Sequence, residues 1–323
     1  MREIALQDIS GFRIGSAENV DAATGCTIII CPTGAPCSVD IRGGGPASRE
    51  TELLNPVAAA EFVHAVVLSG GSAYGLSSAD GVMRYLEEHD IGLPVGDALV
   101  PLVVASCIFD LECGKNVRPD AAMGYAACVA AEKNLPLVEG NYGVGTGATV
   151  GKLLGEEWMM KAGLGTYALA VGDLQVGAVV AVNALGDVLD EEGKVLCGLR
   201  DPSGGGLADT RKLLLEKGEA LAQIMQGAVT NTTIGAVITN GKFNKAQLKK
   251  IAALASNGMV RAVCPVNTTA DGDAIYALSV GEVAADLDYT GVLAAYAVEQ
   301  AIRRAVRAAE TAYGVPALDQ FCK

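Results

Sequence analysis

Two adjacent threonines, in the stretch GAVTNTTIGAVITNGKF (residues 227–243), are the first residues whose chemistry needs an explanation. They follow Asn231 and open an apolar run, and strands favour threonine, so an ordinary structural role is one interpretation. The other interpretation is that Thr232 is a nucleophile, which then requires a base. The chain has only two histidines, His64 inside an apolar run and His89 at the end of a helical pattern, and both positions favour structural roles. No Ser-His-Asp triad is indicated.

The base can come from the chain itself if Thr232 is the first residue of a cleaved product. A free α-amine has a pKa of about 7.7–8.0, close to neutral pH, so it can accept the proton of the hydroxyl. The hydroxyl of Thr232 would first attack the carbonyl of Asn231 and break the Asn231–Thr232 bond. This hypothesis predicts an α chain of residues 1–231 and a β chain of residues 232–323.

Two glycine motifs resemble catalytic or binding loops incompletely. GGSAYG, around Ser72, has one residue too many for the G-x-S-x-G elbow, and we predict that Ser72 caps a helix instead. GVGTG (residues 143–147) lacks the G-x-G-x-x-G spacing, and we predict a tight turn that leads to Lys152. The interpretation of the chain as a dinucleotide-dependent oxidoreductase would rest on the GVGTG motif alone.

Composition excludes several classes of function. Half of the 323 residues are hydrophobic, and a net charge of −13 argues against nucleic-acid binding. No apolar run approaches the length of a membrane span, and the charged start has no signal-peptide core, so we expect a cytoplasmic protein without a membrane partner. The nine cysteines, an odd number without C-x-x-C, are expected to be reduced; we predict no metal and no cofactor.

The elements that must position these residues can be read from hydrophobic periodicity. Strands are predicted at CTIIICP and EFVHAVVLSGG, at a hairpin over 167–188 that turns at Gly172-Asp173, after Thr232, and over 274–282. Helices are predicted over 72–90, 118–134, 207–224, 244–263 and 290–314, with a surface loop over 190–206. Paired β runs among alternating strands and helices predict an α/β protein, one domain over 1–323, with a sheet-on-sheet core and helices outside.

Several long phrases occur in order along nearly the whole chain: GFRIG, TGCTIIICP, VDIRGGGPASRETELLNP, LSGGSAYGLSSADGVMRYLEE, RPDAAMGYAAC, GNYGVGTGATVGK, TNTTIGAVITN and DGDAIYALSVGE. Together they resemble the self-processing S58 (P1) peptidase family. That family includes L-aminopeptidase/D-esterases, β-peptidyl aminopeptidases and nylon-oligomer hydrolases. The resemblance implies a four-layer αββα sandwich like that of N-terminal-nucleophile hydrolases, autocleavage, and homotetramers of α/β heterodimers.

The resemblance also assigns roles to residues. Thr232 matches the nucleophile that begins the β chain, and Asn183, in VVAVNALGDV, matches an asparagine beside the reaction centre. A side-chain amide is a suitable neutral donor to an oxyanion. Lys152 matches the lysine of nylon hydrolases. Asp271 and Asp273, in DGD, match an aspartate pair of those enzymes; without the resemblance, DGD would be interpreted as a plain turn.

Phe109 and Thr233 are predicted to belong to the substrate pocket. The family commonly has tyrosine where this chain has Phe109, in CIFDL, so a phenol donor is missing here. We expect this difference to affect either processing or the way in which substrate is held.

These observations predict an autoprocessing N-terminal-threonine amidohydrolase. Its expected substrates are small amino-terminated amides or peptides, or ω-amino-acid oligomers of the nylon (6-aminohexanoate) type, which the pair Asp271 and Asp273 favours. The alternative within the family is a β-peptidyl or L-aminopeptidase/D-esterase. The alternative from another class is an unprocessed, non-enzymatic protein with the same fold.

Overall fold

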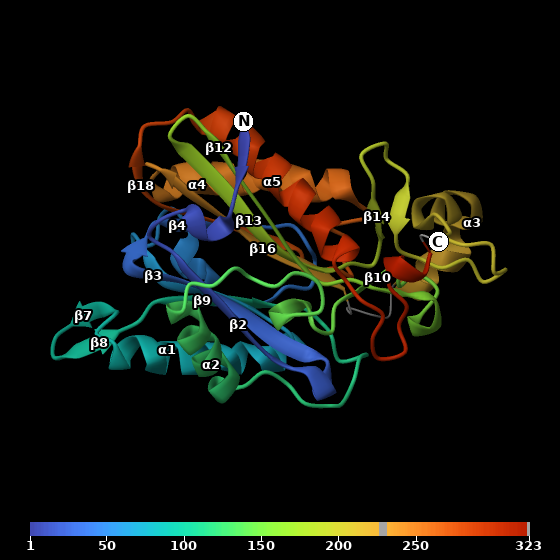
Figure 1. The fold of residues 1–323 in the computed structure, drawn as a ribbon, viewed down its shortest axis with the longest axis horizontal. Helices are drawn as coiled ribbons and strands as arrows, with labels where there is room; N and C mark the ends of the chain where they lie inside the picture. The colour runs from blue at the N-terminus through green and yellow to red at the C-terminus, as the bar shows by residue number, and fades with distance from the viewer. Residues whose placement is uncertain (226–230, 322–323) are drawn as a thin grey trace.

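Two β-sheets lie face to face at the centre of the computed structural model, with helices covering the outer face of each sheet (Figure 1). The structure describes residues 1–225 and 231–321. The layers follow the order helix, sheet, sheet, helix, and they confirm the four-layer αββα sandwich predicted from the sequence.

The larger sheet carries the predicted hairpin and the strand that begins at Thr232. Its strands lie in the order β1 (Arg2–Ile4), β12 (Leu164–Val171), β13 (Leu174–Asn183), β16 (Thr232–Gly241), β18 (Ala274–Val283) and β4 (Cys37–Ile41). Strands β12 and β13 pair antiparallel around the predicted Gly172-Asp173 turn, which confirms the hairpin. Strand β16 lies between β13, which is antiparallel to it, and β18, which is parallel.

The smaller sheet contains the strands predicted from CTIIICP and EFVHAVVLSGG. Its order is β2 (Arg13–Asn19), β3 (Thr24–Ala35), β6 (Val63–Ser69), β9 (Val103–Cys107) and β5 (Ala47–Arg49). In the part of the chain that the structure describes, short strands form three further sheets: β7 (Leu93–Val95) with β8 (Ala98–Val100), β10 (Thr149–Val150) with β11 (Met160–Lys161), and β15 (Val195–Cys197) with β14 (Asp187–Leu189) and β17 (Val263–Cys264). Strand β15 therefore interrupts the segment 190–206 that was predicted to be entirely loop.

Among the described residues, four helices form the outer layers and a fifth lies beside them. Helices α4 (Lys245–Ala262) and α5 (Leu287–Arg307) cover the larger sheet, whereas α1 (Ser78–Glu88) and α2 (Ala121–Glu132) cover the smaller one. Helix α3 (Thr210–Met225) lies at one end of the sandwich (Figure 1). Helix α5 ends at Arg307, before the predicted end at Gly314. Within the described ranges, none of the helices is both long enough and apolar enough to span a bilayer.

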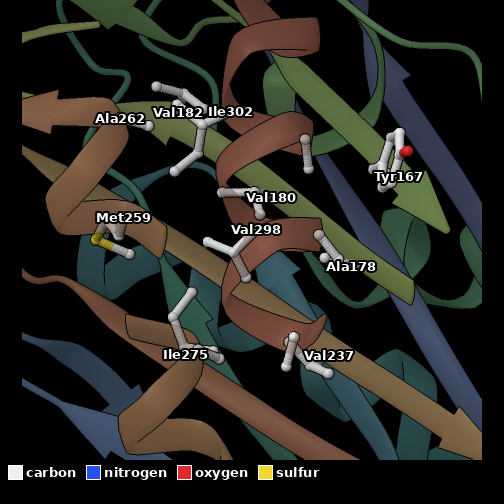
Figure 2. Packing of buried hydrophobic residues seen from close by; sticks show 14 of the residues in the cluster. Tyr167, Ala178, Val180, Val182, Val237, Met259, Ala262, Ile275, Val298 and Ile302 are labelled. Carbon is white, nitrogen blue, oxygen red and sulfur yellow. The ribbon is translucent and has the colours of Figure 1, made fainter. Parts of the chain in front are cut away.

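Side chains alternate between two cores along the central strands. Ile234 and Ala236 of β16 face the core between the sheets, whereas Val237 faces the core beneath α4 and α5. Figure 2 shows Val180 of β13 beside Val298 of α5 in that second core. Both faces of β16 are therefore buried, and its first residue lies at the end of the inter-sheet core.

The predicted helix cap at Ser72 is wrong. Its backbone N–H donates to the Ile108 carbonyl at 2.9 Å, and Gly71 N donates to Asp110 Oδ1 at 2.6 Å. These contacts tie the segment to the end of β9 and hold Gly71 and Ser72 at φ of +81° and +53°. Ser72 is itself the first residue of a 3₁₀ segment (Ser72–Ser77), and the α-helix begins only at Ser78.

Close packing of α4 on α5 gives a prediction about stability. A Cβ at Gly258 would lie 2.0 Å from the Ala295 carbonyl oxygen of α5. Glycine to alanine in a free helix stabilises by about 1 kcal/mol, but overpacking here should cost about 1–3 kcal/mol. Gly258→Ala should therefore lower the melting temperature in a thermal unfolding scan. Asn257→Ala, at an exposed position of the same helix, serves as control. A Gly258→Ala chain that melts as high as the control would contradict this packing.

Candidate active site

Thr232 lies directly opposite Asn183 at the end of two paired strands. It is the first residue of β16, and Asn183 is the last residue of β13. Strand alternation turns the Thr232 side chain to the same face as Ile234, toward the inter-sheet space. Thr232 and Asn183 are 4% and 0% exposed. The register of one strand pair thus brings together two of the predicted site residues.

The side-chain amide of Asn183 connects three segments of the chain. Its Oδ1 accepts from Lys152 Nζ at 2.9 Å and from the backbone N–H of Thr149 at 3.1 Å. Its Nδ2 donates to the backbone carbonyl of Phe109 at 2.8 Å. One end of the amide faces two donors, an ammonium and an N–H, so it must be the oxygen. The other end faces a carbonyl, so it must be the nitrogen, which donates.

Phe109 reaches this network through its main chain. The residue is half-buried, and its carbonyl oxygen accepts the hydrogen bond from Asn183. A tyrosine or any other residue at this position could supply the same carbonyl. The pocket role predicted for the Phe109 side chain stays a prediction.

Lys152 forms a buried ion pair that sequence reasoning missed. Its Nζ lies 3.5 Å from Glu112 Oε2, and the two side chains are 5% and 12% exposed. Glu112 follows Phe109 by three residues, so one short segment contacts both Asn183 and Lys152. The signal in the sequence is the presence of two acidic residues, Asp110 and Glu112, within the apolar run CIFDLEC, which does not reveal their partners.

The aspartates of DGD hold backbone N–H groups around the start of β16. Asp273 accepts from Thr233 N at 2.6 Å and from Asn267 N at 2.9 Å. Asp271 accepts from the backbone N and the hydroxyl of Thr268 at 2.8 and 2.6 Å. Burial, with the charge of Asp271 adding to it, raises the pKa of Asp273 to about 7, and burial also raises the pKa of Asp271.

Gly272 lies against the bond that precedes Thr232. Its N–H donates to the Asn231 carbonyl oxygen at 2.9 Å, and the Thr232 hydroxyl donates to the same oxygen. A Cβ at Gly272 would lie 2.7 Å from Thr232 Oγ1, so glycine is needed here for close approach. The carbonyl carbon of Asn231 therefore lies beside a hydroxyl, and its oxygen beside an N–H donor.

A glycine-rich loop, RGGGP, holds the DGD turn from the other side. Arg42 N donates to the Asp273 carbonyl at 3.0 Å, and Gly45 N donates to the Asp271 carbonyl at 2.9 Å. A Cβ at Gly43 would lie 2.3 Å from the Asp273 nitrogen. The loop had no predicted function, although its three consecutive glycines are a signal of close backbone contact.

The remaining candidates lie apart from this hydroxyl. Thr233 is fully buried, and alternation turns its side chain to the opposite face of the sheet from Thr232. Its predicted place in the substrate pocket stays a prediction. His64 is buried in β6 and accepts from Leu102 N at 3.0 Å, a structural contact that fits its expected role.

Comparison with known proteins identifies related chains. A family model described as peptidase family S58 matches residues 5–318. An uncharacterised aminopeptidase of Mycobacterium leprae is 36% identical, over 97% of this chain and 92% of its own. A 6-aminohexanoate-oligomer endohydrolase of Agromyces sp. is 32% identical, over 87% and 76%. The structure of an L-aminopeptidase D-Ala-esterase/amidase from Ochrobactrum anthropi, described as a variant of the Ntn hydrolase fold, matches with a TM-score of 0.66 at 20% identity, over 97% and 88%.

The buried acidic pair gives a prediction about pH. With a pKa raised from 3.8 to about 7, Asp273 keeps in the folded chain a proton that the unfolded chain loses. Its stabilising contribution is therefore full below about pH 4 and is lost as the pH rises through about 7. In urea unfolding, the free energy of unfolding of the parent chain minus that of Asp273→Asn should fall between about pH 4 and pH 7 and level off above about pH 7.

Both chains in this comparison carry Thr232→Ala, so that no new α-amine forms beside the pair. The pKa values of Asp110 and Asp187 are also raised by burial, to about 6, but both residues are present in both chains and their effects cancel in the difference. Two stability curves that stay parallel over this range would contradict the prediction.

Proposed function

The chain belongs to peptidase family S58 and is an amide-bond hydrolase, and we propose that it cuts itself between Asn231 and Thr232 and then uses Thr232 as nucleophile. The observation that carries this proposal is the position of the Thr232 hydroxyl, which donates to the carbonyl oxygen of Asn231 opposite Asn183.

Autocleavage begins with attack of Thr232 Oγ1 on the carbonyl carbon of Asn231. The C–O bond forms, the C–N bond breaks, and the nitrogen of Thr232 takes the hydroxyl proton, which leaves an ester. Water then hydrolyses the ester, giving the carboxylate of Asn231 and a Thr232 with a free amine and a free hydroxyl. The Gly272 N–H, 2.9 Å from the Asn231 oxygen, stabilises negative charge on that oxygen during attack.

Turnover of a substrate uses the amine that cleavage creates. The α-amine, with an intrinsic pKa of about 7.7–8.0, takes the proton of its own hydroxyl, directly or through water, and returns it to the leaving amine. The amide of Asn183 donates to the oxyanion of the tetrahedral intermediate. Lys152, bound to the other end of that amide, keeps the donor end oriented and adds positive charge to the site.

The aspartates serve the same amine. Asp273 binds the backbone N–H of Thr233, the residue next to the new terminus, so its carboxyl lies close to the terminus. In the cut enzyme, Asp271 and Asp273 hold the Thr232 ammonium or orient the protons of the neutral amine.

The substrates we propose are amides or peptides of small amino-terminated molecules, or ω-amino-acid oligomers. The names of the relatives, an aminopeptidase and a 6-aminohexanoate-oligomer endohydrolase, support both classes. The presence of Asp271, Asp273 and Lys152 favours the oligomer class. A β-peptidyl or L-aminopeptidase/D-esterase activity is the second candidate, supported by the fold shared with such an esterase. Homotetramers and a cytoplasmic location remain predictions.

Processing is tested by the mass of the purified protein. We expect two fragments, residues 1–231 and 232–323, because the Thr232 hydroxyl is in place to break this bond. Thr232→Ala should stay full-length and inactive on amides. The control is Thr239→Ala on the same strand, whose hydroxyl donates to the Gln175 carbonyl and which should still be cut.

A fragment that begins at Thr233 would move the nucleophile to the opposite face of the sheet. A Thr232→Ala protein that is still cut would refute the proposal, and a wild-type chain that stays whole would favour the non-enzymatic alternative.

A further inference from the structure

Lys161 is a fully buried lysine whose ammonium is surrounded by backbone carbonyls. It is 0% exposed, at the end of β11. Its Nζ donates to the carbonyl oxygens of Ala162 at 2.7 Å, Ala148 at 2.8 Å and Gly145 at 3.2 Å. Three carbonyls therefore bind the ammonium directly. Among residues 1–225 and 231–321, the negative charge of Asp110 also favours the protonated form, without a hydrogen bond to it.

The ammonium is retained in spite of its burial. Burial lowers the pKa of Lys161 to about 8, which still leaves the side chain protonated at neutral pH. Its three N–H groups then match three carbonyls, one each. A buried charge is costly unless polar groups compensate it, so an apolar residue would be the simpler choice for a site that only fills space.

Two of the three carbonyls, those of Gly145 and Ala148, belong to the loop that supplies two contacts of Asn183, whereas Ala162 directly follows Lys161. Gly145 and Ala148 lie in the turn that leads to β10, and Thr149 of β10 pairs directly with Lys161 of β11. The Thr149 N–H and, three residues later, Lys152 Nζ both donate to the same oxygen of Asn183. A shift of this loop would thus move both donors together.

We propose that Lys161 is a positioning residue: its ammonium holds the turn at Gly145–Ala148 so that Thr149 and Lys152 meet Asn183. The inference rests on the proposed function, because its consequence is the orientation of the amide that donates to the oxyanion. Lys161 itself touches neither substrate nor the reacting atoms. A substitution far from the reacting atoms that shifts a catalytic group by about 1 Å can lower the rate by about 10²-fold.

Lys245 offers a matched control. It is also buried, at 4% exposed, and its Nζ donates to the carbonyls of Ala60 at 2.7 Å and Ala58 at 3.1 Å. These carbonyls lie in the segment before β6 rather than in the loop of the site. Loss of either ammonium should destabilise the protein, but only loss of the Lys161 ammonium should change the orientation of the Asn183 amide.

The experiment compares Lys161→Met and Lys245→Met in the full chain, with kcat, KM and melting temperature measured on an amide substrate. Both variants should melt at lower temperature, because buried carbonyls lose their donors. Lys161→Met should lower kcat by about 10- to 100-fold with KM within about threefold, whereas Lys245→Met should keep kcat within about twofold. Equal values of kcat in the two variants would overturn the proposal.

A second variant, Lys161→Ala, is expressed and purified with propylammonium, which replaces the deleted part of the side chain. Propan-1-ol, of similar size but uncharged, is the control. We expect propylammonium to raise kcat at least about tenfold over propan-1-ol; equal recovery with both compounds, or recovery with neither, would overturn the proposal.

If wild type cuts itself and hydrolyses amides while these tests fail, only the role of Lys161 is lost. If wild type does neither, the proposed function fails.

Discussion

Antiparallel pairing of Thr232 with Asn183 is the interaction on which the rest of the site depends. It places a hydroxyl and an amide donor at the ends of neighbouring strands, on one face of the larger sheet. The amide then binds Thr149, Lys152 and the Phe109 carbonyl, so segments from different parts of the chain converge on it. A slip of one residue between β13 and β16 would turn Thr232 into the helix-covered core.

The chemistry proposed for Thr232 depends on buried charges that the fold keeps in place. Lys152 pairs with Glu112, Lys161 is held by carbonyls, and Asp273 binds N–H groups of the backbone. Electrostatic interactions are stronger in such a desolvated setting than in water, and groups that are already oriented need no rearrangement during the reaction. The same burial raises the pKa of Asp273, which makes the aspartate pair sensitive to pH near neutrality.

Local patterns predicted most of the fold, and the resemblance to a family predicted which residues meet. Thr232, Asn183, Lys152 and the DGD turn lie together as expected. Glu112 was missed because its partner is 40 residues away along the chain, and only the packing of the sheets brings the two together. The cap at Ser72 was wrong because contacts to the end of β9 override local propensity. Both failures concern tertiary contacts, which periodicity does not encode.

The most direct test of this account is the turnover number of Asn183→Ala, measured per processed Thr232 terminus. Removal of one oxyanion donor typically lowers kcat by about 10²–10³-fold, and we expect a loss of that size. Asn240→Ala is the control, because Asn240 lies near the far end of β16 and its amide also binds backbone groups, Gln175 N and the Asp173 carbonyl. Its kcat should stay close to that of wild type. An Asn183→Ala enzyme whose kcat stays within about twofold of wild type, well below that range, would contradict the account.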